Sequence, residues 1–248
     1  MTRPESCASP NSASPRALAI VFDDPIPYAN ALRWQTALVA ARQDAAIPDV
    51  ILALEHRPVI TRGVRAHDAH VLASPLRLGE LGIEVYDTPR GGDVTYHGPG
   101  QIVLYPILRL AGEEADAHQH VARLEETAIR TAADFGVAAE RRAGKTGVWT
   151  PSGKLAAIGV RFQRWVSSHG ISFNVAPNLE HFGLIVPCGL AGEAVTSLQA
   201  LLGAGCPAVV SVRAALLRHF GAVSGRVFDG YRADAPNLPD TIARILSQ

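Results

Sequence analysis

At residues 88–101 the chain reads Thr88-Pro89-Arg90-Gly91-Gly92-Asp93-Val94-Thr95-Tyr96-His97-Gly98-Pro99-Gly100-Gln101. The glycine pair at 91–92 permits backbone conformations, and a close approach to a ligand, that a Cβ atom would block. Polar and aromatic side chains surround this backbone, and the apolar residues 102–108 that follow predict a buried strand behind it. A loop that leads into a rigid strand is typical of a binding or catalytic site, with an ordinary glycine-rich hairpin as the alternative.

The composition limits the classes of protein to which this chain can belong. With 248 residues, 48% of them hydrophobic, it is long enough to bury a large core. Lys plus Arg and Asp plus Glu both number 23, so no net charge favours nucleic acid or a membrane surface. No apolar run approaches the roughly 18 residues that cross a bilayer. Residues 1–16, rich in Ser and Pro, predict a disordered tail, and residues 17–248 a single domain.

Cysteine and histidine usage argues against disulfides and metal sites. Cys7, Cys188 and Cys206 are an odd number at wide spacing, without a Cys-x-x-Cys pair, so we expect reduced thiols in the cytoplasm. The histidines at 118 and 120 are too close in sequence to share one helical face, so no metal is expected. We expect most histidines at the surface, namely His67, His70, His118, His120 and His219. Nucleotide phosphate-binding loops are absent from the sequence as well.

Two residue types remain as candidates for chemistry. Only Lys145 and Lys154 are lysines among the 23 basic side chains. An ammonium can lose its proton when buried, whereas a guanidinium stays charged, so both lysines are candidates for a catalytic role. Cys188 follows a proline and precedes a glycine, a setting that suits a thiol accessible to a substrate. A buried, inert thiol is the alternative, and local sequence does not separate Cys188 from Cys206, which also lies beside a proline.

Periodicity predicts the secondary structure. The predicted strands are 17–22, 49–54, 84–88, 102–108, 137–141, 146–150, 154–160 and 171–175. The predicted helices are 28–43, 116–135, 197–202, 211–220 and 240–246. Asp116 and Gln119 form a possible capping pair, and Gly136 a stop. Residues 151–153 and 167–170 are predicted turns, and the second of them would hold His169 at a strand end. This order favours an α+β sheet with helices packed on one side.

Five motifs in order resemble the lipoate-biosynthesis octanoyltransferases. They are residues 55–63, residues 90–101, Gly153-Lys154-Leu155-Ala156-Ala157-Ile158-Gly159, His169-Gly170-Ile171-Ser172-Phe173-Asn174 and Pro187-Cys188-Gly189. The resemblance covers roughly residues 17–220. It implies the α+β fold of biotin and lipoate protein ligases, with a mixed central sheet flanked by helices. It also implies an acyltransferase, octanoyl-[acyl-carrier-protein]:protein N-octanoyltransferase, which moves octanoyl to the ε-amine of a lipoyl-domain lysine in the first step of endogenous protein lipoylation.

The resemblance also implies roles for individual residues. A Cys and a Lys form the catalytic dyad of the family, and the matching positions are Cys188, which would carry octanoyl as a thioester, and Lys154. The residues implied to bind the acyl group are Arg90, Gly91, Gly92, Asp93, Val94, Thr95, Tyr96, His97, Ala157, Ile158, Gly159, Gly170, Ile171 and Ser172. The family more often has Ala-Leu where this sequence has Ser172-Phe173. This difference concerns the length of the acyl chain that the enzyme prefers.

The implied partners are two kinds of carrier protein. Acyl carrier protein would bring the substrate on its phosphopantetheine arm, so no cofactor of the enzyme itself is expected. The acceptors would be lipoyl domains of 2-oxoacid dehydrogenase complexes and the glycine cleavage H protein, with no nucleic acid and no membrane involved.

Two rival functions use the same features differently. An ATP-dependent lipoate or biotin ligase shares the fold but needs no nucleophilic cysteine. A catalytically dead module that binds carrier domains would keep the groove without its chemistry. The presence of both Cys188 and Lys154 favours transfer, and a requirement for ATP would discriminate a ligase.

Overall fold

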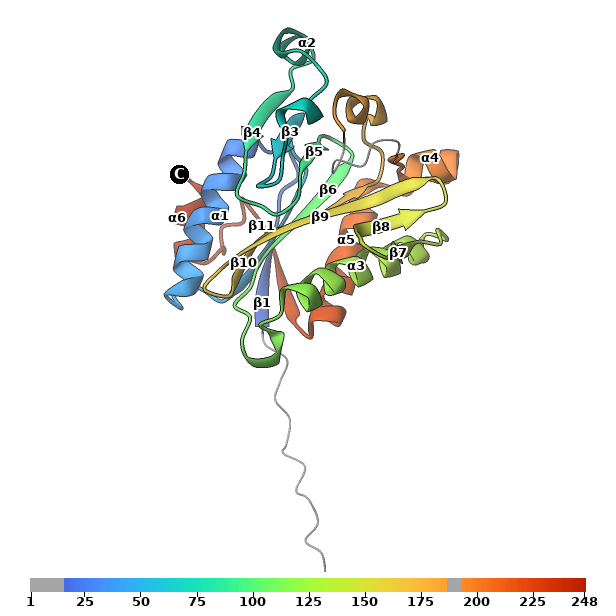
Figure 1. Ribbon diagram of the computed structural model, residues 1–248. Coiled ribbons are helices and arrows are strands. Elements are labelled where there is room, and N and C mark those ends of the chain that lie inside the picture. Colours follow the sequence, from blue (N-terminus) through green and yellow to red (C-terminus); the bar gives the residue numbers. More distant parts are fainter. Residues whose placement is uncertain (1–15, 187–192) are drawn as a thin grey trace, which may run out of the picture.

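The computed structural model describes residues 16–186 and 193–248, and a mixed eight-stranded sheet forms its centre (Figure 1). The strand order is β11-β1-β2-β6-β10-β9-β8-β7. The strands are β1 (Arg16–Val21), β2 (Asp49–Leu54), β6 (Gln101–Ile107), β7 (Glu140–Arg142), β8 (Lys145–Thr150), β9 (Gly153–Gln163), β10 (Val166–Asn174) and β11 (Val227–Arg232). β1 pairs in parallel with β2 and β11, and the other neighbours are antiparallel.

A small second sheet lies at one end of the large one, near the top of Figure 1. Its order is β4-β3-β5, with β3 (Val59–Arg62), β4 (Glu84–Asp87) and β5 (Val94–His97). The α-helices are α1 (Tyr28–Gln43), α2 (Pro75–Glu80), α3 (Ala117–Asp134), α4 (Leu198–Leu202), α5 (Val209–Ser224) and α6 (Asp240–Leu246). Short 3-10 turns include η1 (Asp68–His70), η2 (Gly112–Glu114), η3 (Leu179–Leu184) and η5 (Gly203–Gly205).

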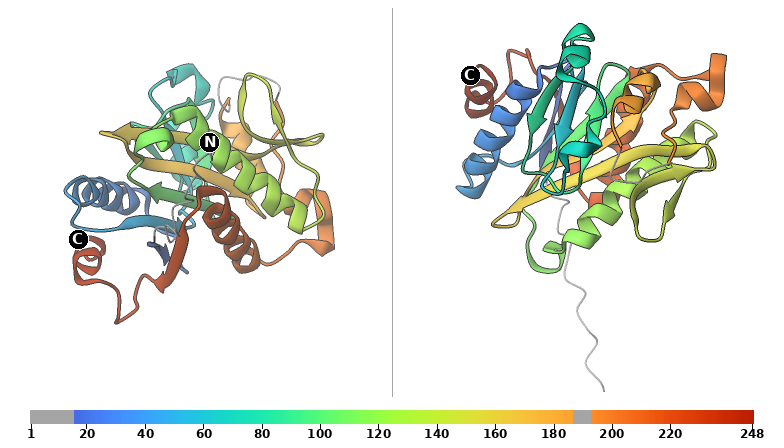
Figure 2. Two further views of the ribbon diagram at one scale, coloured as in Figure 1. Left: turned by 90° about the horizontal axis from the view of Figure 1, so that it is seen from below. Right: turned by 45° about the horizontal axis from the view of Figure 1, so that its top comes forward.

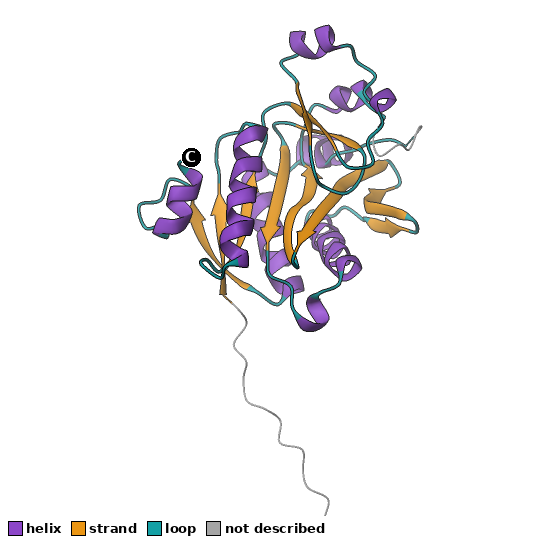
Figure 3. Cartoon of the chain, turned by 60° about the vertical axis from the view of Figure 1, so that its left-hand side comes forward, coloured by secondary structure: helices purple, strands orange, loops and turns teal. Residues whose placement is uncertain are grey.

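Helices cover both faces of the large sheet, so the expectation of helices on one side was wrong. α1 and α6 pack against one face, and α3 and α5 against the other (Figure 2). Figure 3 shows α1 lying across the strands of its face. The physical reason is visible in β2, whose six residues, Asp-Val-Ile-Leu-Ala-Leu, are all buried. A strand that is apolar on both faces must be covered on both.

Local signals predicted some elements well. α1, β2 and α6 have the predicted bounds. The side chain of Asp116 accepts hydrogen bonds from the backbone N–H groups of His118 and Gln119 at the start of α3, which confirms it as the N-cap. The amide oxygen of Gln119 accepts from Arg123 instead of completing a capping pair. Gly136, with φ 75°, follows the end of the helix as predicted.

The predicted turn at residues 167–170 was wrong. β10 runs straight through these residues, and the chain reverses at Arg164 and Trp165, which have φ values of 48° and 58°. His169 therefore lies inside a strand, with an unusual φ of 55°. The short strands β3, β5 and β11 and the helix α2 were not predicted. Residues 137–139, predicted as strand, lie outside β7.

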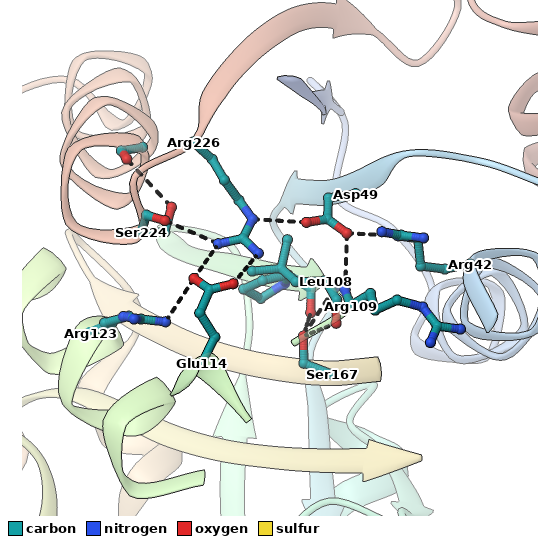
Figure 4. Close-up of polar contacts among 11 residues, drawn as sticks. Arg42, Asp49, Leu108, Arg109, Glu114, Arg123, Ser167, Ser224 and Arg226 are labelled. Atoms are coloured by element: carbon teal, nitrogen blue, oxygen red, sulfur yellow. Dashed lines mark hydrogen bonds and ion pairs between the residues drawn. The ribbon is translucent and has the colours of Figure 1, made fainter. Parts of the chain in front are cut away.

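A buried ion network joins the N-terminal end of β2 to its surroundings (Figure 4). Asp49 accepts hydrogen bonds from the Arg42 Nε at 2.7 Å, the Arg109 backbone N–H at 2.9 Å and the Arg226 Nε at 2.8 Å. The Arg226 Nη2 also donates to Glu114 at 3.1 Å. The side chain of Arg226 is only 3% exposed, so its charge depends on these carboxylates for compensation.

Asp49→Ala is expected to destabilise the fold by about 3 to 5 kcal/mol, because it leaves the buried Arg226 charge without one of its carboxylates. The free energy of unfolding is measured by urea denaturation. Asp87→Ala is the control: Asp87 also pairs with an arginine, Arg62, but its side chain is 76% exposed. Removal of such a surface pair costs less than about 1 kcal/mol. Equal losses in the two variants would show that the network contributes no more than a surface pair.

Candidate active site

A cavity lies where the glycine-rich loop crosses β9 and β10. It contains about 460 Å³ of empty space, with open solvent at its mouth included. The lining residues come from the loop, β5, β6, β9, β10 and the first turn of α1: Tyr28, Arg90, Gly92, Asp93, Val94, Thr95, His97, Val103, Tyr105, Ala157, Ile158, Gly159, His169, Gly170, Ile171 and Ser172.

Direct backbone contact between the loop and β9 forms this cavity. The Gly91 N–H donates to the Val160 carbonyl oxygen at 2.9 Å. At Gly159 a Cβ atom would lie 2.8 Å from the Gly91 carbonyl oxygen, which is too close for any other residue. The loop can therefore rest on the strand because β9 carries glycine at the crossing, and a Cβ atom at Gly91 would also be tight, 3.2 Å from the Val160 carbonyl oxygen. Since the Gly91 N–H is already bonded, it is not a free oxyanion donor.

Arg90 holds the loop to the small sheet. Its Nη2 donates to the Thr61 carbonyl oxygen at 2.7 Å and to the Thr61 hydroxyl at 2.9 Å, and its Nη1 donates to the Gly91 carbonyl oxygen at 3.0 Å. The residue is 7% exposed and lines the cavity. Arg90 thus acts as a fixed brace, and it places a buried positive charge beside the ligand space.

One wall of the cavity is aromatic: Tyr28, His97, Tyr105 and His169 line it, and His56, behind them, contacts Tyr28 and Tyr105. The His56 Nδ1 donates to the Ile26 carbonyl oxygen at 3.0 Å, and its Nε2 accepts from the Tyr105 hydroxyl at 2.7 Å. Burial lowers the pKa of His56 to about 4 and that of His169 to about 3, and it lowers the pKa of His97 well below its usual value. These imidazoles are therefore neutral at physiological pH. Such a wall suits an apolar or neutral ligand.

Lys154 lies on β9, three residues before Ala157, and does not line the cavity itself. It is 6% exposed, and its Nζ lies 4.7 Å from the ring centroid of Trp149, a cation–π contact that positions the ammonium. Gly147 leaves the space for this side chain, since a Cβ there would lie 3.2 Å from the Lys154 Cε. The structure thus buries Lys154 on the same strand as the cavity residues Ala157, Ile158 and Gly159. Lys145, in contrast, forms an ion pair with Glu193.

Cys188 lies outside the described residues, but both ends of the segment that contains it are attached at this site. Before it, the Val186 N–H donates to the His70 carbonyl oxygen at 2.8 Å, and the His70 Nδ1 lies 2.6 Å from Asp93, which lines the cavity. After it, the carbonyl oxygen of Ala194 accepts from the Lys154 N–H at 2.8 Å. The two flanks therefore meet the cavity rim and Lys154.

Cys206, which the sequence did not separate from Cys188, has unsuitable surroundings for a nucleophile. Its Sγ lies 3.8 Å from the Val175 carbonyl oxygen and 3.6 Å from that of Pro207. Burial raises the pKa of this thiol, so the reactive thiolate is disfavoured. Cys206 is also not among the residues that line the cavity.

The structure brings nearly all the residues of the implied acyl-binding set together around the cavity. Gly91 and Tyr96 do not line it. Tyr96 points into a small core behind β5, where its hydroxyl lies 2.8 Å from the His181 Nδ1. Ser172 faces the cavity, whereas its neighbour Phe173 lies in the core on the other face of the sheet.

Sequence reasoning missed four lining residues, Tyr28, Val103, Tyr105 and His169, as members of the site. The alternation of residues 103 and 105 along a predicted strand was an available signal for two of them. His120, expected at the surface, is 1% exposed and packs against Phe162.

Comparisons with known proteins agree with the sequence motifs. The family model of the lipoyl protein ligase A/B catalytic domain matches residues 27–221. An octanoyltransferase from Gloeobacter violaceus is 46% identical over 200 residues, which cover 79% of this chain and 87% of the relative. An octanoyltransferase from Chloroflexus aurantiacus is 44% identical over 211 residues, 84% of this chain and 94% of the relative.

Solved structures show the same fold. The crystal structure of lipoate-protein ligase A bound with ATP has a TM-score of 0.75 at 13% identity, over 95% of this chain and 93% of that one. A bi-partite lipoate protein ligase from Thermoplasma acidophilum has a TM-score of 0.72 at 14% identity, over 94% and 91%. The expected ligase-like fold is confirmed. Within residues 16–186 and 193–248, no helix is long and apolar enough to cross a membrane.

Proposed function

The chain belongs to the lipoyl protein ligase A/B catalytic domain family and, within it, to the octanoyltransferases, which are acyltransferases, and we propose that it moves octanoyl from acyl carrier protein to a lipoyl-domain lysine through a thioester on Cys188. The observation that carries the proposal is that the described residues on either side of Cys188 are bonded here: Ala194 accepts from the Lys154 backbone N–H, and Val186 donates to His70, which pairs with Asp93. This arrangement supports a thiol and an ammonium acting at one cavity.

The first half-reaction forms the acyl-enzyme. The Lys154 ammonium stabilises the Cys188 thiolate, whose pKa would otherwise be roughly 8.5. The thiolate attacks the carbonyl carbon of the incoming thioester, and the bond to the phosphopantetheine sulfur breaks. That sulfur leaves as a thiolate and takes a proton from Lys154, which becomes neutral. The exchange of one thioester for another needs no other source of energy.

The second half-reaction transfers octanoyl to the acceptor. The neutral amine of the lipoyl-domain lysine attacks the Cys188 thioester, and the neutral Lys154 takes the proton that the attacking nitrogen loses. The bond to Cys188 then breaks and regenerates the thiolate beside the Lys154 ammonium. The ring of Trp149, whose centroid lies 4.7 Å from the Lys154 Nζ, holds this side chain in place.

The cavity fits the acyl part of this reaction. Apolar side chains of Val103, Ile158 and Ile171 are among those that line it, and the glycines of the loop and strands let backbone approach the ligand. The acyl-binding roles implied for the lining residues remain part of this proposal, as do the carrier-protein partners. A cytoplasmic location stays a prediction.

Initial rates are expected to follow a double-displacement pattern without ATP. At several fixed concentrations of octanoyl-acyl carrier protein, double-reciprocal plots against lipoyl-domain concentration should be parallel, because the first product leaves before the second substrate reacts. Intersecting lines would indicate direct transfer within a ternary complex and remove the Cys188 thioester from the mechanism. Dependence on ATP would instead identify a ligase, and failure of Cys188 to be acylated would favour a binding module.

A further inference from the structure

The side chain of Lys154 contacts two residues of β8, the strand beside its own. Its Nζ lies 4.7 Å from the centroid of the Trp149 ring. At Gly147 a Cβ atom would lie 3.2 Å from the Lys154 Cε and 3.6 Å from its Nζ. These contacts involve the end of the side chain that carries the charge. The position of the ammonium therefore depends on the course of β8 through residues 147–149.

The backbone of β8 is irregular at this point. Gly147 has φ 121°, a conformation that residues with a side chain rarely adopt. The register with β9 shifts between Val148, which pairs with Ala156, and Trp149, which pairs with Lys154. Such a β-bulge changes the direction of the side chains beside it and is common near active sites. Because glycine is the most flexible residue, a contact from another element stabilises one such course over the others.

Glu125 of α3 supplies that contact. Its Oε1 accepts a hydrogen bond from the Gly147 N–H at 3.0 Å, and its Oε2 accepts one from the Arg141 Nε at 3.1 Å. The residue is 8% exposed. A buried carboxylate lowers stability unless its oxygens are hydrogen-bonded, and both oxygens of Glu125 are. Glu125 is thus fixed at both oxygens, and in turn it fixes the backbone at Gly147.

Gly147 links Glu125 to Lys154. The carboxylate accepts from the backbone N–H of this glycine, and the lysine side chain lies against the same glycine where a Cβ atom would stand. Glu125 itself does not line the cavity, and the family motifs do not include it. Loss of its hydrogen bond would leave the buried Gly147 N–H without this acceptor. The backbone could then shift, and with it the surface on which Lys154 lies.

We propose that Glu125 is a positioning residue, which holds the Lys154 ammonium in place through the backbone of Gly147. The inference rests on the proposed function, in which this ammonium stabilises the Cys188 thiolate, and it deepens that function by adding a residue that the sequence did not assign. The attraction between two opposite charges falls as their separation grows. A displaced ammonium therefore stabilises the thiolate less, and alkylation of Cys188 then requires a higher pH.

The test measures how the rate of Cys188 alkylation by iodoacetamide depends on pH, with the modified peptide identified by mass spectrometry. In Glu125→Ala the pH midpoint is expected to rise by about one unit, a roughly ten-fold loss of thiolate at neutral pH. Glu125→Gln keeps an oxygen that accepts from Gly147, so its midpoint should match the wild type. Glu126→Ala is the matched control, because Glu126 also bonds Arg141, at 2.8 Å, and its loss leaves the bond to Gly147 intact.

Lys154→Met, which removes the ammonium, sets the upper limit of the shift. A shift in Lys154→Met without one in Glu125→Ala would overturn the positioning role and leave the proposed dyad intact. Equal shifts in Glu125→Gln and Glu125→Ala, or a shift in Glu126→Ala, would overturn it as well, since charge or Arg141 would then be the cause. If thermal unfolding shows that Glu125→Ala does not fold, Glu125→Asp replaces it. Its carboxylate is drawn back from Gly147 by about 1.5 Å, one C–C bond, and the same rise is expected.

An unchanged midpoint in Lys154→Met would instead contradict the proposed function. The reaction of Lys154 with an amine-acetylating reagent then tests the positioning role by itself, with Lys145 as the internal reference because the chain has no other lysine. Faster acetylation of Lys154 relative to Lys145 in Glu125→Ala, but not in Glu125→Gln, would support the role. A ratio unchanged from the wild type would overturn it.

Discussion

Cys188→Ser is expected to lower octanoyl transfer by about three orders of magnitude or more. A serine hydroxyl beside a lysine stays protonated at neutral pH and is a far weaker nucleophile toward a thioester than a thiolate. The measurement is the rate of octanoyl transfer to a lipoyl domain, together with the intact mass of the enzyme after incubation with octanoyl-acyl carrier protein. The wild type should gain one octanoyl group on the peptide containing Cys188, and the variant none.

Cys206→Ser is the matched control and should keep nearly full activity. The Sγ of Cys206 lies near the carbonyl oxygens of Val175 and Pro207, burial raises the pKa of its thiol, and the residue does not line the cavity. An inactive Cys206→Ser beside an active Cys188→Ser would reverse the assignment of the nucleophile.

Lys154→Arg is expected to retain part of the first half-reaction and lose the second. A guanidinium still supplies positive charge, so the Cys188 pKa should stay lowered and acylation should partly survive. Arginine, with a pKa above roughly 12, cannot accept the proton from the incoming lysine near neutral pH. Acyl-enzyme should therefore accumulate, with overall turnover reduced by about 100-fold or more, the usual range for loss of a general base. Rapid-quench mass spectrometry resolves the two half-reactions.

Lys145→Arg is the control for this substitution. Lys145 forms an ion pair with Glu193 and is more exposed than Lys154, so an arginine there can keep the pair, and activity should be nearly unchanged. Thermal unfolding of both variants checks that the larger side chain is accommodated beside Trp149. Near-native deacylation in Lys154→Arg would leave Lys154 as an electrostatic group only and assign the base to another residue, with His97 the next candidate.

Local sequence determined the elements whose signals lie within a few residues. The bounds of α1, β2 and α6 followed from periodicity and from the flanking prolines, because these signals act over one or two turns or one strand. The Asp116 cap and the Gly136 stop are local for the same reason. The family motifs likewise identified the loop and strand segments that the structure gathers around the cavity.

The sequence did not predict strands that form through pairing with distant segments when their local composition is typical of another structure. Ser-Ser-His-Gly at residues 167–170 has turn composition, yet β10 continues through it because β6 and β9 pair with it on both sides. Tertiary pairing overrides weak local propensity in such a case. The strands β3 and β5 have only four residues each, and they are defined by their pairing with each other and by that of β3 with β4.

The sequence by itself determined the family to which the chain belongs, through its ordered motifs, and it showed the rarity of lysine and the glycine pair of the loop. The catalytic roles of Cys188 and Lys154 stay predictions from the family resemblance. Only the tertiary structure decided which lysine is buried, that Cys206 lacks a suitable environment, and that Tyr28 and His169 join the residues that line the cavity. The physical reason is that burial and electrostatic environment depend on contacts between residues far apart in the chain, which no local pattern encodes.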